Sequence, residues 1–375
     1  MNIRIIQVIL DVFDHYGENI RFEEERFEEA LNDEAPDLLD ECFWIIRGFQ
    51  TGIYDAMIFD EDIYRNGYVK YLMENIECEE KEAIFIVAVF ETVITEISYY
   101  FEIPDMLSLL QDAYERQDYP QLAIIAKTYF LGFGVSQDYE KAFEIYSYLY
   151  GHGGDDCGAY YLGFMYEHGY GIEQDIEKAM MYYHSRQDDL TDYRLGTFYM
   201  LGQYFEYDAK KAYEHLSRSH LEEAYLYKGL LLEEQRNFAG AFEAYFEGAQ
   251  LFQVECLYRA ALCLRMGLGV EIDLKKAYHY FEYGYFFMHK ESTYQLSMML
   301  FDGLVVEKDE KKALLYLHQA AQLRSRDACL LLGQLYELGR YVKKDHQKSL
   351  AYYQVASEIL NQSNEKESRE NYENI

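Results

Sequence analysis

The stretch 160-YYLGFMYEHGYGIEQDIEKAMMYY-183 contains two glycines, Gly169 and Gly171, in a G-x-G spacing. Asp175 follows four residues after the second glycine, and Lys178 follows three residues after the aspartate. Glycines in this spacing hold a phosphate when they follow a β-strand and open a helix. Here no β-type run precedes them and they follow a helical pattern, so we interpret them as a turn that ends one helix before the next begins.

The acid–lysine pair could be taken for acid–base machinery, but it recurs along the chain. The six copies are Asp138/Lys141, Asp175/Lys178, Asp208/Lys211, Asp273/Lys276, Asp309/Lys312 and Asp345/Lys348. A catalytic pair has no reason to appear six times in one chain, whereas a helix cap with a paired surface charge does. We therefore expect the aspartates to cap helices.

The other reactive side chains form no pattern that points to catalysis or to a metal. The histidines include His152 and His168, neither of which has a partner at ligand spacing, so turn roles are expected. The chain lacks C-x-x-C, G-x-S-x-G, H-E-x-x-H and Walker motifs. Its cysteines are expected to be reduced thiols in the core: Cys42, Cys78, Cys157, Cys256, Cys263 and Cys329. The sequence thus predicts no catalytic residue, no cofactor and no metal.

The opening motif belongs to an internal repeat, and a repeat must be positioned by paired helices. Related copies occupy residues 125–146, 162–183, 195–216, 260–281, 296–317 and 332–353, with a shorter unit at 225–249. Each contains a small residue near the end that lies 29 to 37 residues from the next: Ala142, Ala179, Ala212, Ala241, Ala277, Ala313 and Ser349. Leu162, Met165 and Tyr166 form one apolar helix face. Because one helix pair cannot cover its own apolar face, stacked pairs and a solenoid are predicted.

This pattern resembles the Sel1-like repeat family, which is related to the tetratricopeptide repeats. The family's motif is matched at Leu162, Gly163, Tyr166, Gly169, Gly171, Ile172, Asp175, Lys178 and Ala179. Tyr204 and Val305 replace the second glycine in the third and sixth units. The fourth unit lacks the loop insertion and is similar to a plain tetratricopeptide repeat. The resemblance implies an all-α, right-handed α-solenoid of helix pairs that takes part in protein–protein interaction.

Four regions are expected along the 375 residues. They are an acidic helical N-terminal domain (1–103), a linker or capping helix (104–118), seven repeats (119–357) and a polar tail (358–375), for which we expect no ordered structure. Within the first region, helices are predicted over residues 3–17, 21–33, 36–53 and 79–101.

The net charge of −33 restricts the choice of partner, and most of the acidic excess lies in residues 1–118. An acidic surface repels nucleic acid, so we expect no nucleic-acid binding, whereas a basic protein or peptide would be attracted. Solubility alone would also explain the charge. The start of the chain reads as an amphipathic helix and not as a signal peptide, and the apolar run 83–90 is too short to span a bilayer. We therefore expect a bacterial cytoplasmic protein without membrane contact.

The resemblance also implies a binding surface, because the first helix of each pair lines the concave face in related repeats. The residues expected there for partner binding are Tyr160, Phe164, Tyr193, Tyr258, Arg265, Tyr294 and Phe301. Rigid aromatic side chains in a groove suit an extended peptide or a helix. The alternative is that these residues pack between stacked units.

These observations favour a scaffold or adaptor that binds a partner segment in the concave face. One alternative is an inhibitor or immunity-type protein that neutralises a basic partner, which the acidic N-terminal region motivates. The other is a hydrolytic enzyme, against which the missing nucleophile and metal motifs argue. Because the exposed ends of a solenoid can pair, the sequence leaves the oligomeric state open.

Overall fold

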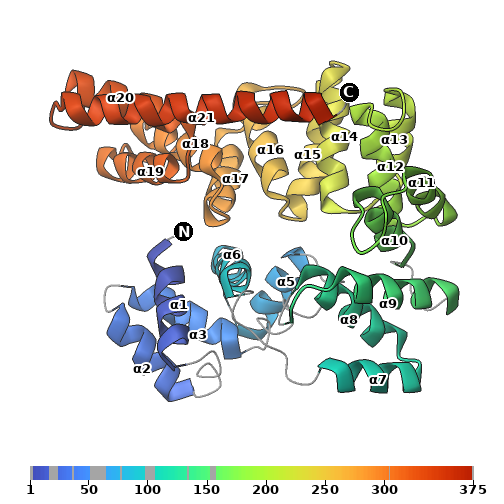
Figure 1. The fold of residues 1–375 in the computed structure, drawn as a ribbon. Helices are drawn as coiled ribbons and strands as arrows, with labels where there is room; N and C mark the ends of the chain where they lie inside the picture. The colour runs from blue at the N-terminus through green and yellow to red at the C-terminus, as the bar shows by residue number, and fades with distance from the viewer. Residues whose placement is uncertain are drawn as a thin grey trace.

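The structure of the chain is a computed structural model (Figure 1). It describes residues 3–16, 24–35, 38–50, 65–76, 78–97, 106–132, 135–152, 158–303 and 305–373. Every regular element in these ranges is an α-helix, so the predicted all-α class is confirmed. The segment that contains Cys157 lies outside the described residues.

The N-terminal part is a small helical assembly with its own apolar core. Its described helices are α1 (Ile3–Tyr16), α2 (Glu24–Glu34), α3 (Leu39–Gln50), α5 (Arg65–Ile76) and α6 (Glu80–Ile97). Helix α6 lies at the centre, since it packs against α1, α3 and α5 and buries Ile84, Val87 and Phe90 completely. Four of these helices were predicted from the apolar pattern. Helix α5 was not, because Asn66 and Gly67 interrupt its start.

Seven helix pairs follow, preceded by α7 (Met106–Arg116), which packs on the first of them. We call the pairs units 1 to 7, each with a first and a second helix. They are α8 (Tyr119–Leu131) with α9 (Tyr139–His152), α10 (Gly158–His168) with α11 (Ile176–Ser185), α12 (Asp189–Leu201) with α13 (Ala209–Leu216), α14 (Glu222–Glu234) with α15 (Phe238–Gln250), α16 (Val254–Met266) with α17 (Leu274–Phe286), α18 (Lys290–Asp302) with α19 (Glu310–Gln322), and α20 (Arg326–Leu338) with α21 (His346–Glu373).

The glycine pair of the opening motif is a turn, as predicted. Gly169 and Gly171 have φ angles of +72° and +69°, in the left-handed region that favours glycine. A Cβ atom on Gly171 would lie 2.5 Å from the carbonyl carbon of Tyr139, at the start of the preceding second helix. The second glycine therefore lets the loop pack directly on the neighbouring unit. Tyr204 and Tyr341 take the same place in units 3 and 7 with φ of +61°.

The repeated aspartates cap the second helices, also as predicted. The Asp175 carboxylate accepts a hydrogen bond from the backbone N–H of Lys178 at 3.0 Å, and the other five copies make the same contact. In units 1, 2, 3 and 7 the lysine ammonium group then lies over a tyrosine ring of the first helix, as Lys178 does over Tyr166 at 5.1 Å. In these units the motif fastens the second helix to its first helix.

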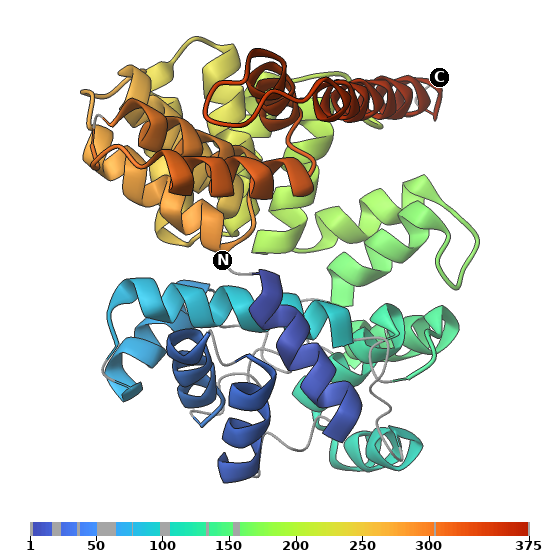
Figure 2. The same cartoon turned by 90° about the vertical axis from the view of Figure 1, so that its left-hand side faces the viewer.

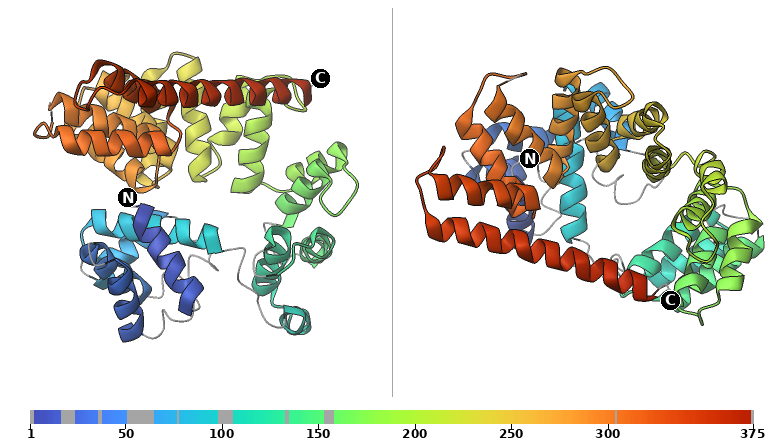
Figure 3. Two further views of the ribbon diagram at one scale, coloured as in Figure 1. Left: turned by 60° about the vertical axis from the view of Figure 1, so that its left-hand side comes forward. Right: turned by 90° about the horizontal axis from the view of Figure 1, so that it is seen from above.

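The pairs follow a curved path (Figure 3), and the contacts between units place the first helices on its inner side. First helices of neighbouring units pack on each other, as α12 does on α14 and α14 on α16. Among the described helices, no two second helices approach each other as closely. Helices that meet along a curved stack lie on its shorter, inner side. We call the surface formed by the first helices on that side the inner surface.

The N-terminal helices fold back onto the array and contact unit 5 (Figures 1 and 2). Helix α6 packs against α17, where the rings of Phe85 and Phe286 meet edge to face with centroids 6.4 Å apart. Lys81 forms an ion pair with Glu282 at 3.9 Å, and its ammonium group lies 5.9 Å from the centre of the Phe286 ring. The apolar core of the N-terminal helices is thereby continuous with that of units 4 and 5.

The polar tail differs from the expectation of no ordered structure, because α21 continues through it to Glu373. Beyond residue 358 the helix extends past its partner α20 (Figure 1). The physical reason is composition: the segment 358–373 contains no proline or glycine, and its glutamates, lysine and arginine are good helix formers.

Candidate functional site

At four junctions, neighbouring units are joined by a contact that uses the same two positions of the first helices. Each first helix has a small residue at its centre: Ala126, Gly163, Gly196, Gly229, Ala261, Ser297 and Gly333. In a contact between neighbouring units, one side chain comes from the residue four positions after the small residue. The other comes from the next unit, from the residue two positions before the small residue of that unit. We call each such contact a joint. The observed joints include Phe130–Tyr161, Glu167–Arg194, Glu233–Arg259 and Arg265–Gln295.

The joint between units 2 and 3 is a buried ion pair. Glu167 is 1% exposed and accepts two hydrogen bonds from the Arg194 guanidinium, one of them from Nε at 3.1 Å. It accepts a third from the Tyr183 hydroxyl at 2.8 Å. The guanidinium lies over the Phe198 ring at 4.7 Å. A buried carboxylate with this many donors is fully satisfied, so the joint fixes how the two units stack.

Tyrosine reaches this carboxylate because the small residue of the first helix makes room for its ring. A Cβ atom on Gly163 would lie 2.7 Å from the Tyr183 ring. Burial, and then the charge of Glu167, raises the pKa of Tyr183 strongly, so the phenol stays a hydrogen-bond donor. Unit 4 repeats the arrangement, with Tyr245 against Gly229.

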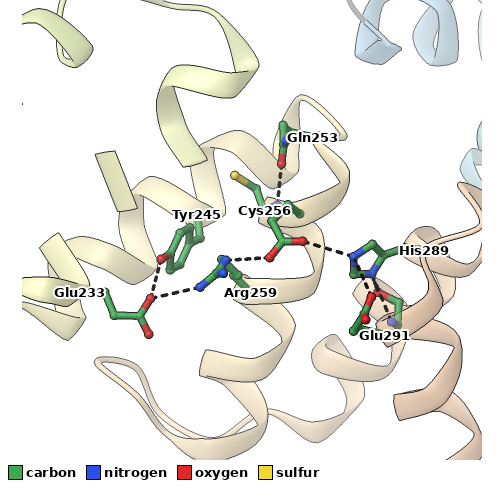
Figure 4. A network of polar contacts seen from close by, with 9 residues as sticks. Glu233, Tyr245, Gln253, Cys256, Arg259, His289 and Glu291 are labelled. Carbon is green, nitrogen blue, oxygen red and sulfur yellow. Dashed lines mark hydrogen bonds and ion pairs between the residues drawn. The ribbon is translucent and has the colours of Figure 1, made fainter. Parts of the chain in front are cut away.

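The joint of units 4 and 5 extends into a longer polar network (Figure 4). Tyr245 donates to Glu233 at 2.7 Å, and Arg259 pairs with both Glu233 and Glu255 at 3.3 and 2.8 Å. His289 of unit 6 contacts Glu255 at 3.3 Å. Burial would raise the pKa of Glu255, but the hydrogen bonds and charges of His289 and Arg259 outweigh it and lower that pKa. The carboxylate is therefore ionised and held in place.

The predicted tyrosines lie in one row along the first helices, three positions before the small residue of each unit. They are Tyr160, Tyr193, Tyr258 and Tyr294, and all four are half-buried. The row is interrupted in unit 4, where Leu226 takes the position. Tyr193 lies 5.8 Å from Tyr227 of the next unit, measured between ring centres. The row therefore contributes to packing between units and also presents part of each ring to solvent.

Acidic residues that the sequence reading missed form a second row beside these tyrosines. They lie six positions before the small residue in four consecutive units: Glu223, Glu255, Glu291 and Asp327. Burial and then the carboxylates of Glu291 and Glu255 raise the pKa of Tyr258. Burial, and then the carboxylate of Asp327, raises the pKa of Tyr294. Aligning the units on their small residues would have revealed this row, because the acid recurs at one position.

The remaining predicted binding residues lie at the joints. Arg265 donates a hydrogen bond to Gln295 of the next unit. Phe301 stacks on Tyr341, with ring centres 4.8 Å apart, and Phe164 lies under the Arg194 guanidinium at 5.7 Å. These three side chains therefore contact neighbouring units, and their use in binding a partner stays a prediction.

The described residues contain no arrangement of groups that could hold a metal ion. The five described cysteines are buried and form no disulfide; burial raises the pKa of Cys263 to about 11, which keeps this thiol protonated and unreactive. Among the described helices, none has an apolar run of the length and purity needed to cross a membrane.

Fold and joints together define an α-solenoid of stacked helix pairs, and comparison with known proteins gives its family. The Sel1 repeat model matches residues 121–149, 158–185, 192–219, 254–284, 290–325 and 326–358. The array therefore belongs to the Sel1 repeat family, and the chain is a Sel1-like repeat protein. The matches pass over unit 4, which the sequence had set apart as a plain tetratricopeptide-like pair.

Two solved structures share the fold. A protective antigen of uropathogenic Escherichia coli strains, described as displaying an SLR fold, aligns with a TM-score of 0.59 and 21% sequence identity. The alignment covers 77% of this chain and 64% of that protein. A Sel1 repeat protein from Oxalobacter formigenes aligns with a TM-score of 0.51 and 19% identity over 85% of each chain. Among curated proteins, none matches the chain.

Proposed function

We propose that the chain is a protein-interaction scaffold that holds a basic segment of another protein on its inner surface. The observation that supports this most is the pairing of the two rows on the first helices. From unit 4 to unit 7 a carboxylate recurs at one position, and in units 5 and 6 a half-buried tyrosine lies beside it. Sel1 repeats are generally protein–protein interaction modules, which agrees with this use of the surface.

Tyrosine and carboxylate groups in alternation suit lysine and arginine side chains. A cation is attracted by the face of an aromatic ring and by a neighbouring carboxylate at the same time. Tyr258, for example, has Glu255 and Glu291 close enough to raise its pKa after burial. An extended or helical segment with several basic residues would thus meet the same chemistry in successive units.

The overall charge favours the same kind of partner. A net charge of −33 attracts a basic protein from a distance and speeds its association at low salt. The five buried thiols fit a reducing compartment, so we place this function in the cytoplasm. The absence of a metal-binding arrangement among the described residues leaves the scaffold as the function with most support.

Selection from a random peptide library against the full chain tests the proposal. We expect the selected peptides to be rich in lysine and arginine and to bind more weakly at high salt. Tyr258→Ala and Glu291→Gln should each weaken binding about three- to tenfold. Tyr213→Ala is the matched control, because Tyr213 is exposed and lies on the second helix α13. Acidic or neutral peptides, or binding that neither inner-surface variant changes, would contradict the proposal.

A further inference from the structure

The last unit repeats the carboxylate–tyrosine arrangement of units 2 and 4, but without the arginine. Glu337 lies four positions after Gly333, as Glu167 does after Gly163. The Tyr353 hydroxyl donates to Glu337 at 3.0 Å, and a Cβ atom on Gly333 would lie 2.6 Å from the Tyr353 ring. In units 2 and 4 this carboxylate and tyrosine receive an arginine from the next first helix.

Exposure of the side chains shows that this face is open among the described residues. Tyr183 and Tyr245 are 0% and 1% exposed, whereas Tyr353 is only half-buried and Glu337 is exposed. Three positions before the tyrosine, units 2 and 4 have half-buried apolar side chains, while Leu350 of unit 7 is 54% exposed. The face therefore presents an apolar side chain beside an acid that forms no ion pair with any described residue.

The long C-terminal helix does not cover this face. Helix α21 runs antiparallel to α20, so its extension lies at the start of α20, where Gln362 accepts a hydrogen bond from Arg324 at 2.9 Å. Glu337 lies at the opposite end of α20. Among the described residues, no helix stacks on unit 7 from outside.

We propose that this face, formed by Glu337, Leu350 and Tyr353, binds an α-helix of another protein that presents an arginine to Glu337. The chemistry comes from the two filled joints, where Arg194 precedes Gly196 and Arg259 precedes Ala261 by two residues. In both filled joints the guanidinium reaches the carboxylate of the preceding unit, whereas the small residue packs against the second helix of its own unit, as Gly196 does against Leu216. The unneutralised charge of Glu337 matches this cation.

The partner differs from the segment proposed for the inner surface, and the two sites lie on different helix faces. The tyrosine and acidic rows lie three and six positions before the small residue of a first helix, as Tyr258 and Glu255 do before Ala261. The terminal face consists of Glu337, four positions after Gly333, and of side chains on the second helix α21. Failure of one proposal therefore leaves the other intact.

A helical peptide with the sequence of residues 253–266, stapled to keep it helical, is the probe. It reproduces α16 with its capping residue Gln253 and contains Arg259. The matched peptide carries Arg259→Gln. Each peptide is fluorescently labelled and titrated with the full chain in reducing buffer, and anisotropy reports binding.

We expect the arginine peptide to bind and the Arg259→Gln peptide to bind at least about tenfold more weakly. Glu337→Gln in the full chain should cause a similar loss, and Tyr353→Phe a smaller one. Glu358→Gln is the control on α21, because Glu358 is exposed and its carboxylate accepts a hydrogen bond from Gln354 of the same helix. Circular dichroism confirms that the variants remain folded.

Three results would overturn the proposal. The peptide does not bind, or it binds equally well after Glu337→Gln, or the Arg259→Gln peptide binds as tightly as the original. Light scattering is the further check: a dimer of the chain that dissociates on Glu337→Arg would mean that a second copy occupies this face and not a helix of another protein.

Discussion

Arg194 of unit 3 holds the carboxylate of Glu167 in unit 2, and Arg259 of unit 5 holds that of Glu233 in unit 4 by the same pair of positions. A solenoid is stabilised by contacts between neighbouring units. The joints set this stacking, and the binding of a partner along the tyrosine and acidic rows stays a proposal.

Replacement of Arg194 by methionine should destabilise the array strongly. The change would leave Glu167, which is 1% exposed, without its cation. Breaking a buried pair in this way costs about 3–5 kcal/mol of unfolding free energy. Urea denaturation followed by circular dichroism measures the loss. Lys210→Met is the control, because Lys210 is exposed and lies 3.9 Å from Glu214; equal losses for both variants would show that the joint has no special role.

Separate alanine replacements of Gly202 and Gly171 should distinguish the cost of backbone strain from the cost of a lost contact between units. Gly202→Ala should cost about 1–2 kcal/mol, because its φ is +67° but the nearest atom to the new Cβ lies 3.7 Å away. Gly171→Ala should cost roughly 1–3 kcal/mol more, since its Cβ would lie 2.5 Å from the Tyr139 carbonyl carbon. Thermal and urea unfolding of both variants provide the comparison. Equal costs would mean that the loop does not press on the preceding unit.

His318 should make the stability of units 6 and 7 depend on pH. Burial, and then Lys348, lowers the pKa of His318 in the folded chain. The unfolded chain therefore takes up the proton first, at about pH 6.5. Stability from this residue is complete above that value and is lost as the pH falls through it towards the lower folded pKa. His318→Gln should reduce the fall in unfolding free energy between pH 7.5 and 5.5, and an unchanged fall would exclude His318 as its source.

The contact between the N-terminal helices and unit 5 can be tested by a zero-length cross-link. A carbodiimide joins an amine to a carboxylate in direct contact, and Lys81 lies 3.9 Å from Glu282. We expect mass spectrometry of the monomer to find the Lys81–Glu282 peptide pair. Phe286→Ala should reduce its yield, because the Phe85–Phe286 contact would be lost. A cross-link that persists unchanged would mean that other contacts hold the N-terminal helices there.

The repeats could be predicted from the sequence because the residues that cap helices and form turns recur in successive units. Asp175 and Gly169 each have counterparts in other units, so a cap and a turn can be recognised by comparison within one chain. Helix α5 has no such counterpart, and Asn66 and Gly67 interrupt its start, so it was missed. The fold-back of α6 onto α17 could not be predicted, because it joins residues such as Phe85 and Phe286 that are distant in sequence and have no repeating pattern.

The candidate site was predicted in part. The row of Tyr160, Tyr193, Tyr258 and Tyr294 follows from the repeat, and its use in binding stays a prediction. Arg265 and Phe301, also predicted for that surface, lie four positions after the small residue and contact Gln295 and Tyr341 of the next unit; their use in binding likewise stays a prediction. Side-chain direction at that position depends on how units stack, which the sequence of a single helix does not specify.

Hydrogen–deuterium exchange of the full chain, with and without a selected basic peptide, tests the central claim most directly. The account predicts that bound peptide slows exchange in the first helices α14, α16 and α18, and that Glu291→Gln reduces this protection. Protection confined to second helices such as α15 and α17, or to the acidic N-terminal helices, would contradict it and would place the binding surface elsewhere.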